Sequence, residues 1–566
     1  MPGVHFARGG RMSKDQNGVK HAGSFKEQFT ARGMVIGVIG AIILTMSSMF
    51  VALKISSLPW PIMFVALLSM FALKALGGTN INEINVTHTA MSAGAMVAGG
   101  LAFTLPGIWM LDPEEDINAV ILIVITLGGV VLGLIFTALI RKYFIVTKDL
   151  PYPMGQAAAE ALITGDRGGK KAGVLFGSLG AAAVFTALRD WFLVIPAMLP
   201  VNMSQKMLTF GSFGAIWLSP MLISVGYIIG PVFIGVWFLG ALIGDFGILI
   251  GGQSFGWWDM ETAAAIKSSL GIGLMVGTGI GIIVKGILPK SKEIFGAMFK
   301  KDTLGDSIVK MRWAPIAMVI LAFLFTAIAD MGIIASVITI LGVWVATAMS
   351  AQCVGQSGIN PMEIFGIIVL IVAKAASSVG DLGGINEIAA FFVAAVVAVA
   401  CGLVGDIMND LKAGYILKSD PKAQWYAECI GSLTGAFVAV IVLLAIVKAY
   451  GGEVFGSEVF PAAQAAAVSA MVGGISHMTA FLIGMAIAVV LYCLDFPVMT
   501  LGLGVYLPFY LSATAFVGGA LRFILDRAAP EWSKRGMGQV IAAGVLGGEA
   551  VTGVVIAIII AVRMVL

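Results

Sequence analysis

The stretch that decides the fold reads Gly355-Gln356-Ser357-Gly358-Ile359-Asn360-Pro361-Met362-Glu363-Ile364-Phe365-Gly366 and continues into Ile367-Ile368-Val369-Leu370-Ile371-Val372-Ala373. A polar, glycine-rich segment broken by proline therefore leads directly into a helix that is hydrophobic enough to enter a bilayer. In lipid every backbone polar group must find a partner in the protein, so irregular backbone occurs there only inside protein or beside a watery cavity. Glu363 at the start of the helix indicates a polar pathway, because ionisable residues within membranes usually mark one.

Composition places the whole chain in the membrane. Of its 566 residues, 59% are hydrophobic and only 11% are charged, and the mean hydropathy is +1.00. A soluble protein of this length could not bury so much apolar surface. The net charge of +3 argues against nucleic acid as a partner. The four cysteines lack CxxC spacing, which argues against a disulfide framework and a metal cluster.

Apolar runs of roughly 17–25 residues predict about sixteen membrane spans. The expected fold is an all-α polytopic membrane protein made of two related eight-span halves, with broken or re-entrant helices. Lys and Arg gather in the connections on the same side of the predicted spans as the N-terminal tail, which predicts that the N-terminus is cytoplasmic. The expected location is the cell membrane. The predicted divisions are a cytoplasmic tail (1–32), a first membrane repeat (33–288), a basic cytoplasmic linker (289–312) and a second membrane repeat (313–566).

An internal repeat supports this division, and one pairing of motifs gives a parallel repeat. Asn82 aligns with Asn360 and Gly226 with Gly504, since 360 − 82 and 504 − 226 both equal 278. Pro153 aligns with Pro421 after a small shift, since 421 − 153 = 268. Halves with an even number of spans share one orientation, and substrates then bind between them near the midplane.

A second pairing gives an inverted repeat. Asn82-Glu83-Ile84 also resembles Asn386-Glu387-Ile388, and Pro153-x-x-Gln156 also resembles Pro461-x-x-Gln464. These pairings imply an odd offset in spans. The parallel pairing is favoured, because its motifs are longer and agree with the distribution of basic residues.

Polar groups converge in the segment from Asn80 to Thr89, at the start of a predicted span. Asn82 and Asn85 are suited to hydrogen-bond a polar substrate, and Glu83 or His88 is suited to accept a proton. The alternative is a helix-capping cluster with a satisfied histidine.

Two glutamates, Glu160 and Glu428, follow Pro-x-x-Gln motifs. If these motifs begin membrane-dipping half-helices, the helix N-termini and glutamates face a substrate; if they are surface turns, the glutamates are solvated. Tyr227 and Tyr506 lie beside prolines that predict helix kinks, and Glu549 lies deep in the last predicted span. The candidate substrate-binding residues are therefore Asn82, Asn85, Gln156, Tyr227, Asn360, Glu363, Gln424 and Tyr506, and the candidate proton-coupling residues are Glu83, His88, Glu160, Glu428 and Glu549.

Enzyme signatures are missing from the sequence. It contains no HExxH, no Walker GxxxxGK[ST] and no GxGD motif. Of four histidines, only His88 and His477 lie near spans, which is too few for a catalytic metal site. We therefore predict no catalytic residues, no metal ligands and no cofactor.

The order of several motifs resembles that of the oligopeptide transporter (OPT) family, which includes peptide transporters and yellow-stripe-like carriers of metal chelates. The resemblance covers nearly the whole chain and rests on 82–89, 149–153, 226–231, 358–363, 406–415 and 504–508. It implies a proton-coupled secondary carrier with about sixteen spans that moves small peptides or metal–chelator complexes inward. The compact loops resemble those of prokaryotic members. One departure is Met154, where a serine is expected before Gly155.

These observations predict proton-coupled uptake of small peptides across the cell membrane. One alternative is transport of metal-chelate or siderophore complexes. Others are a polytopic membrane enzyme acting on a lipid-borne substrate, and a channel. The expected partners are a small-molecule substrate, protons and the lipid bilayer, and the apolar outer face permits a homodimer. The prediction requires that Glu83, Asn360 and Glu363 share one cavity.

Overall fold

The computed structural model describes residues 20–55, 62–167, 169–199, 215–281, 311–377, 385–457, 462–472, 475–534 and 536–565, with short pieces at 13–14, 58, 284–285, 289, 307–309 and 460. Most of the predicted basic linker 289–312 and the first part of the predicted tail lie outside the described residues, as does Pro461.

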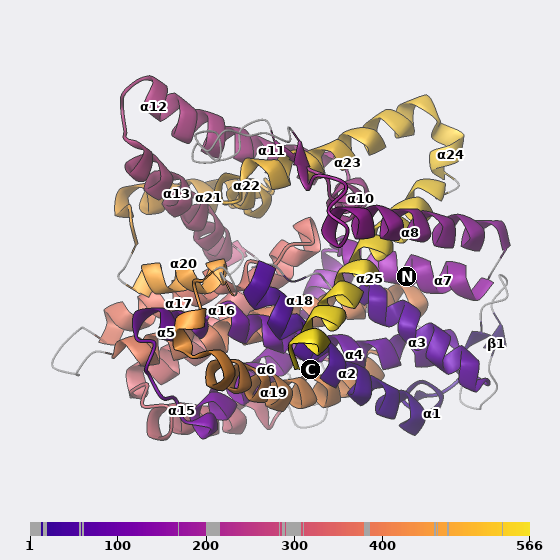
Figure 1. The fold of residues 1–566 in the computed structure, drawn as a ribbon, viewed down its shortest axis with the longest axis horizontal. Coiled ribbons are helices and arrows are strands. Elements are labelled where there is room, and N and C mark those ends of the chain that lie inside the picture. The colour runs from indigo at the N-terminus through magenta and orange to yellow at the C-terminus, as the bar shows by residue number, and fades with distance from the viewer. Residues whose placement is uncertain are drawn as a thin grey trace.

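Helices make up most of the described chain (Figure 1). The first half contains α1 (Phe25–Gln28), α2 (Ala31–Ile55), α3 (Ile62–Leu76), α4 (Ile81–Ala102), α5 (Pro106–Leu111), α6 (Ala119–Arg141), the π-helix η1 (Lys142–Thr147), α7 (Pro153–Arg167), α8 (Gly169–Asp190), α10 (Pro220–Ile229), α11 (Pro231–Ala241), the π-helix η2 (Leu242–Gly251), α12 (Gly252–Ser254) and α13 (Met260–Gly281). The second half contains α15 (Ala314–Ala327), α16 (Ile333–Ser357), α17 (Met362–Ser377), α18 (Glu387–Leu417), α19 (Pro421–Tyr450), the 3₁₀ turn η5 (Gly452–Val454), α20 (Ala463–Val472), α21 (Met478–Cys493), α22 (Val498–Tyr506), α23 (Phe509–Ala528), α24 (Pro530–Lys534) and α25 (Met537–Val565). Two-residue strands form two small antiparallel pairs, β1 (Ser13–Lys14) with β2 (Lys20–His21) and β3 (Met198–Leu199) with β4 (Ile216–Trp217).

Ten helices of the described residues are long and apolar enough to cross a membrane, and four shorter apolar helices accompany them. The predicted all-α polytopic membrane class is confirmed. The count of about sixteen spans stays a prediction. Several short helices arise where proline interrupts an apolar run, as at Gly230-Pro231 between α10 and α11 and at Leu507-Pro508 between α22 and α23.

The core of the molecule is built on α4 and α18. The side chain of Asn80 caps α4 by accepting hydrogen bonds from the backbone N–H groups of Asn82 and Glu83, and every residue of α4 is buried. The two helices run antiparallel along their lengths. At one end Asn82 donates to the carbonyl of Leu417, and at the other Gly100 packs against Val399.

The contact between α4 and α19 is repeated between α18 and α6, so that α4 is equivalent to α18 and α6 is equivalent to α19. A Cβ added to Gly431 of α19 would lie closer than 3.0 Å to the carbonyl oxygen of Ala90 in α4, and one added to Gly129 of α6 would lie 2.8 Å from that of Val396 in α18. Equivalent residues of α4 and α18 are therefore 306 positions apart in the sequence (396 − 90 = 306), and those of α6 and α19 are 302 positions apart (431 − 129 = 302). One turn further on, equivalent contacts join Gly435 to Gly94 and Gly133 to Ala400. Because equivalent helices α4 and α18 run antiparallel, these parts of the chain form an inverted repeat.

The broken helices cross with the same reciprocity. Gly226 of α10 packs on the carbonyl of Ala515 in α23, and Gly504 of α22 packs on that of Trp237 in α11. Here 504 − 226 and 515 − 237 both equal 278. The separation is smaller than 306 because the connection before α10 has 29 residues (191–219), whereas that before α22 has four (494–497).

The favoured parallel pairing is therefore wrong for Asn82 and Pro153. Asn82 corresponds to the start of α18, as in the second pairing, rather than to Asn360. The pairing of Gly226 with Gly504 is correct. Equivalent residues are 278 positions apart only after the long connection 191–219. Applying the same distance to Asn82, which lies before that connection, therefore gave the wrong partner.

Two groups of helices are visible in Figure 1. In this view α10–α13 and α21–α24 lie along the upper side, and α2–α6 with α15–α19 fill the lower side. Among the described residues, each group therefore contains helices from both halves of the sequence.

Candidate functional site

Three acidic side chains meet where α4, α18 and α19 pack together. Asp406 and Asp410 lie one turn apart on α18, and Glu428 lies on α19. One carboxylate oxygen from each residue lies within 4.8 Å of the others, and all three side chains have no exposed surface. We call this group the buried acid cluster.

Polar side chains of α4 and α19 hold Asp410 in place. The Nε2 atom of His88 lies 3.2 Å from Oδ1 of Asp410, and the hydroxyl of Ser92 donates to Oδ2 at 3.0 Å. Gln424 donates its amide to the backbone carbonyl of Asp410 at 2.7 Å. The structure therefore brings the predicted residues His88, Gln424 and Glu428 together.

The other two carboxylates of the cluster lack a basic partner among the described residues. Neither oxygen of Asp406 or Glu428 accepts a hydrogen bond of ordinary geometry there, although Asp406 interacts with the Ser92 hydroxyl and Glu428 with the Asp410 carboxyl. The nearby basic side chain of Lys412 pairs with Asp149 instead, at 2.7 Å. Burying ionised carboxylates without counter-charge is strongly unfavourable, so the cluster must take up protons or another cation.

The equivalent positions in the other half of the inverted repeat carry no acids. With the separations of 306 and 302 found above, Asp406, Asp410 and Glu428 correspond to Gly100, Thr104 and Thr126. The equivalent position in the other half is thus packed with small neutral residues. The acidic side chains are an addition at one of two equivalent places, which points to function rather than packing.

The predicted residues at the start of α4 have a different role. Both carboxylate oxygens of Glu83 accept hydrogen bonds from Arg32, at 2.8 and 2.7 Å, and Thr30 and Thr79 donate to it as well. Asn82 and Asn85 donate to the hydroxyl of Ser419 between α18 and α19.

These contacts clamp the N-terminal segment and the connection between α18 and α19 onto α4. The capping alternative therefore describes Glu83, Asn82 and Asn85 better than the proposed pathway does.

The two Pro-x-x-Gln-x-x-x-Glu motifs also differ. Gln156 and Glu160 of α7 are only partly buried, and Glu160 accepts a hydrogen bond from Thr164 at 3.1 Å. α7 does reach α18, where the Gly155 N–H donates to the side chain of Asn409. Glu160 thus has a local partner outside the buried acid cluster.

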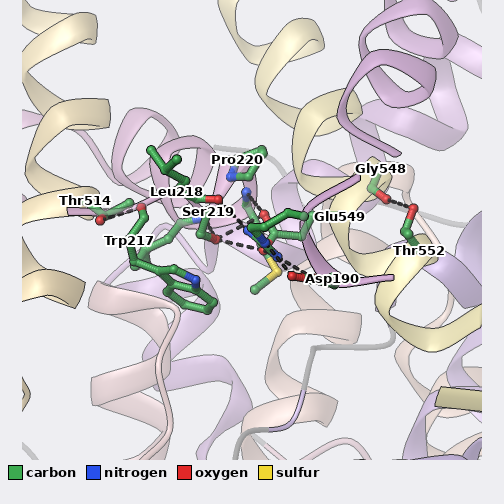
Figure 2. A network of polar contacts seen from close by, with 12 residues as sticks. Asp190, Trp217, Leu218, Ser219, Pro220, Thr514, Gly548, Glu549 and Thr552 are labelled. Atoms are coloured by element: carbon green, nitrogen blue, oxygen red, sulfur yellow. Dashed lines mark hydrogen bonds and ion pairs between the residues drawn. The ribbon is translucent and has the colours of Figure 1, made fainter. Parts of the chain in front are cut away.

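Glu549 lies in a polar network that fixes the start of α10 (Figure 2). Its carboxylate pairs with Arg189 at 2.9 Å, accepts from the hydroxyl of Ser219 at 3.0 Å and accepts from the Met221 N–H at 2.6 Å. Arg189 also pairs with Asp190. Because Glu549 is fully paired and caps a helix, we assign it a structural role in place of the predicted coupling role.

The two helix breaks next to Tyr227 and Tyr506 carry basic side chains. Arg522 donates to the freed carbonyl oxygens of Tyr227 and Ile228, at 3.1 and 2.8 Å. At the second break Lys267 donates to the carbonyl of Leu507 at 3.3 Å and pairs with Asp245 at 2.8 Å. The kinks predicted from proline are thus stabilised by cations that satisfy the exposed carbonyls.

The segment that opens α17 contains both a satisfied amide and an unpaired carboxylate. Asn360 donates to the Cys401 carbonyl at 2.8 Å and accepts from the Ser350 hydroxyl. Glu363 is 9% exposed, has no side-chain partner within the described residues and lies in electrostatic range of Tyr506. We call Gln356, Asn360, Glu363 and Tyr506 the α17 entrance.

The predicted single cavity for Glu83, Asn360 and Glu363 is wrong. Asn360 contacts Cys401 in the middle of α18, whereas Asn82, beside Glu83, contacts Leu417 at its end. The 16 residues between Cys401 and Leu417 span about 24 Å of helix. The α17 entrance and the start of α4 are therefore separate places.

A sequence model described as OPT oligopeptide transporter protein matches residues 28–560. The chain belongs to the OPT family. A Haemophilus influenzae protein named "Putative oligopeptide transporter" is 26% identical to this chain. The alignment is 610 positions long with its gaps and covers 91% of this chain and 92% of the relative. Membership of the OPT family makes this chain a membrane transporter and not an enzyme.

For this OPT family member, residue-level prediction missed Asp406, Asp410 and Ser92 as site residues. A signal was present, because Asp406 and Asp410 lie four residues apart directly after the apolar run 388–405 and so share one face of the helix. Carboxylates on one face of a membrane helix usually mark an ion pathway. Ser92 carries no comparable signal, since small hydroxyl residues are common where membrane helices pack.

Proposed function

We propose that this OPT transporter takes up small peptides across the cell membrane by secondary active transport coupled to protons. The observation that carries the proposal is the buried acid cluster, in which two fully buried carboxylates lack a basic partner among the described residues. A carboxylate in this setting changes protonation when the surroundings open or close, as coupling requires. The name of the Haemophilus influenzae relative supports peptides as the substrate class.

Within this proposal, Asp406, Asp410 and Glu428 exchange the proton, and His88 transfers it or shares it with Asp410. The Nε2 atom of His88 is 3.2 Å from the Asp410 carboxylate, within hydrogen-bond reach for a transfer. Asp410 is also held by Ser92, so its carboxylate is fixed relative to the imidazole.

The α17 entrance is the proposed contact for the peptide. Glu363 is nearly buried and lacks a cationic side-chain partner within the described residues, so a peptide ammonium group suits it. Gln356, which is 8% exposed, has an unpartnered amide oxygen for a second hydrogen bond. The N-terminus is proposed to be cytoplasmic, residues 33–288 and 313–566 are proposed as the two membrane halves, and a homodimer stays a prediction.

The coupling is tested with purified protein in liposomes, by dipeptide uptake with and without an inward proton gradient. Uptake by the wild type should rise with the gradient. Glu428→Gln should abolish this response while counterflow of labelled peptide continues, because binding and exchange need no net proton movement. The matched control is Glu160→Gln, which removes a partly exposed glutamate with a local partner and should keep the response. Wild-type uptake that ignores the gradient would remove the proton from the proposal.

The substrate contact is tested with Glu363→Gln. Loss of a charged hydrogen bond costs about 1.5–3 kcal/mol, so KM for dipeptides with a free amine should rise about 10- to 150-fold. An N-acetylated dipeptide lacks the ammonium and should lose little. An equal loss for both peptides would assign Glu363 to another role.

A further inference from the structure

We propose that the second helix break, between α22 and α23, is a site for a monovalent metal cation in which the ammonium group of Lys267 takes the place of the ion. The ligands would be the carboxylate of Asp245 and the backbone carbonyl of Leu507, which the ammonium contacts. Shortening the lysine should therefore leave a site that binds Na⁺. This inference goes beyond the proposed function and holds whatever ion drives uptake.

The Lys267 ammonium has the surroundings of a bound cation. Its Nζ atom donates to Oδ1 of Asp245 at 2.8 Å and to the carbonyl oxygen of Leu507 at 3.3 Å, and both side chains are buried. Leu507 directly follows α22, where the last carbonyls of the helix have no donors within it and carry a negative partial charge. Unwound carbonyls and helix C-terminal ends coordinate Na⁺ in transporters with broken helices. The oxygens around Lys267 are thus suited to a metal ion.

Asp245 has more binding capacity than the ammonium uses. Its Oδ1 atom faces Lys267, whereas its Oδ2 atom is buried and has no hydrogen-bond partner among the described residues. A metal ion can contact both oxygens of one carboxylate, while the ammonium contacts one. Asp245 carries a single negative charge, so a monovalent ion would neutralise the site as fully as the ammonium does.

The helices around this break have equivalents in the other half of the chain. Gly273 of α13 packs on the carbonyl of Phe481 in α21, and Gly544 of α25 packs on that of Leu175 in α8. Equivalent residues of α13 and α25 are therefore 271 positions apart (544 − 273 = 271). Those of α23 and of α11 with its continuation η2 are 278 positions apart, as the crossing of the broken helices showed.

The first break, between α10 and α11, has a cation but no buried carboxylate among the described residues. Gly538 stands there in place of the lysine, and Phe523 stands in place of the aspartate. Arg522 satisfies the freed carbonyls, and its acidic partner Asp526 is 44% exposed. The buried carboxylate therefore distinguishes the second break, and it supplies the negative charge that a free ion needs.

A tethered ammonium changes what the break can contribute to transport. A free Na⁺ bound at a broken helix can enter from one side of the membrane and leave on the other, and so couple its gradient to transport. The ammonium of Lys267 is attached to α13 and cannot leave the chain. The second break thus keeps its cation without drawing on a Na⁺ gradient.

The test measures binding of radioactive Na⁺ to the full-length protein, purified in detergent with choline as the other cation. Lys267→Ala should bind about one Na⁺ per chain more than the wild type, because alanine vacates the site and leaves its ligands. Adding Asp245→Asn to Lys267→Ala should weaken this binding about tenfold or more, since the charged ligand is lost. Lys267→Met should bind no additional Na⁺, because methionine fills the space of the lysine stem.

Lys285→Ala is the matched control. The ammonium of Lys285 also contacts a carboxylate and a carbonyl, those of Asp495 and Cys493, but this pair is exposed. Water can replace the lost ammonium there, so Na⁺ binding by Lys285→Ala should stay at the wild-type level.

The proposal is overturned if Lys267→Ala binds no more Na⁺ than the wild type, if the additional Na⁺ remains after Asp245→Asn is introduced, or if Lys285→Ala gains it as well. It is equally overturned if the wild type binds a Na⁺ that Asp245→Asn removes, because the ion would then bind beside the ammonium rather than in its place. If Lys267→Ala is not recovered as folded protein, Lys267→Ser is measured, since its hydroxyl can add a ligand. Failure to recover either variant in NaCl would count against the site, because Na⁺ should replace the lost charge. None of these results bears on proton coupling, which uptake in liposomes tests.

Discussion

Replacing Gly504 by alanine tests the reciprocal crossing of the broken helices, and Gly226 is its structural equivalent. A Cβ at Gly504 would come closer than 3.0 Å to the carbonyl oxygen of Trp237, and a Cβ at Gly226 would meet that of Ala515 in the same way. Both obstacles are backbone atoms, which cannot rotate aside as the end of a side chain can. Each substitution must therefore push α10 from α23, or α22 from α11.

The expected size of the effect follows from two opposing contributions. Overpacking a dense interior costs about 1–3 kcal/mol, and alanine regains about 0.5–1 kcal/mol over glycine inside a helix. Each variant should therefore lose about 0–2.5 kcal/mol, with the middle of the range at about 1.3 kcal/mol, and the double variant should lose about twice as much, because the two glycines meet different carbonyls.

The measurement is thermal unfolding of purified protein in detergent, followed by tryptophan fluorescence. Gly235→Ala is the matched control, since Gly235 lies on α11 and a Cβ there would meet nothing within 4 Å. The control should melt at or slightly above the wild-type temperature, and Gly504→Ala and Gly226→Ala should melt below it by similar amounts. If Gly504→Ala melts like Gly235→Ala, the crossing of these helices and the reciprocity drawn from it are incorrect.

Three further substitutions separate structural charges from the coupling site. Glu83→Gln should lower stability by about 0.5–1 kcal/mol, since its partner Arg32 is about a third exposed; gradient-driven peptide uptake in liposomes should stay unchanged, and loss of coupling would return Glu83 to the pathway. Lys267→Met should leave Asp245 buried without a cation and cost about 3–5 kcal/mol, as measured by recovery of monodisperse protein after heating. The double variant Asp245→Asn with Lys267→Met should recover most of that loss, and equal loss in both would show that the pair is not coupled. Glu549→Gln should cost about 1–3 kcal/mol in the same heating assay, because Arg189 then keeps Asp190 as its carboxylate partner and the Leu218 carbonyl but loses Glu549, and should leave the proton response of uptake intact.

The membrane class and the helix breaks could be predicted from the sequence, because hydropathy and proline act locally. Pro231 and Pro508 remove backbone donors wherever they stand, so the breaks at Gly230-Pro231 and Leu507-Pro508 follow directly. His88 and Glu428 were also predicted individually, since an ionisable group within an apolar run is conspicuous.

The grouping of side chains could not be predicted in the same way. Glu83 and His88 are five residues apart, yet Glu83 pairs with Arg32 at the start of α2, whereas His88 contacts Asp410 more than 300 positions away. Whether a buried charge is paired depends on which helices pack together, and that depends on the register of the inverted repeat. The motif pairing with a separation of 278 hid this register, since it holds only for α10, α11, α22 and α23.

The position of the acid cluster in the repeat bears on how coupling would work. Gly402 of α18 packs on the carbonyl of Met96 in α4. The two residues are equivalent in the repeat, since 402 − 96 = 306, so α4 and α18 cross at this point. Asp406 and Asp410 lie four and eight residues from that point, about 6–12 Å along the helix. An inverted repeat has its axis in the membrane plane, so the cluster lies near the midplane but displaced toward the end at which α4 begins.

α2 runs parallel to α4, with Gly37 against Ala90 and Thr45 against Gly94, so this is also the end at which α2 begins. With the proposed cytoplasmic N-terminus, the carboxylates lie on the cytoplasmic side of the axis, while the equivalent outer position holds only Gly100, Thr104 and Thr126. Under the proposed proton coupling, the related helices would allow the two halves to exchange conformations, and protons entering from outside would cross the neutral position before they reach the cluster.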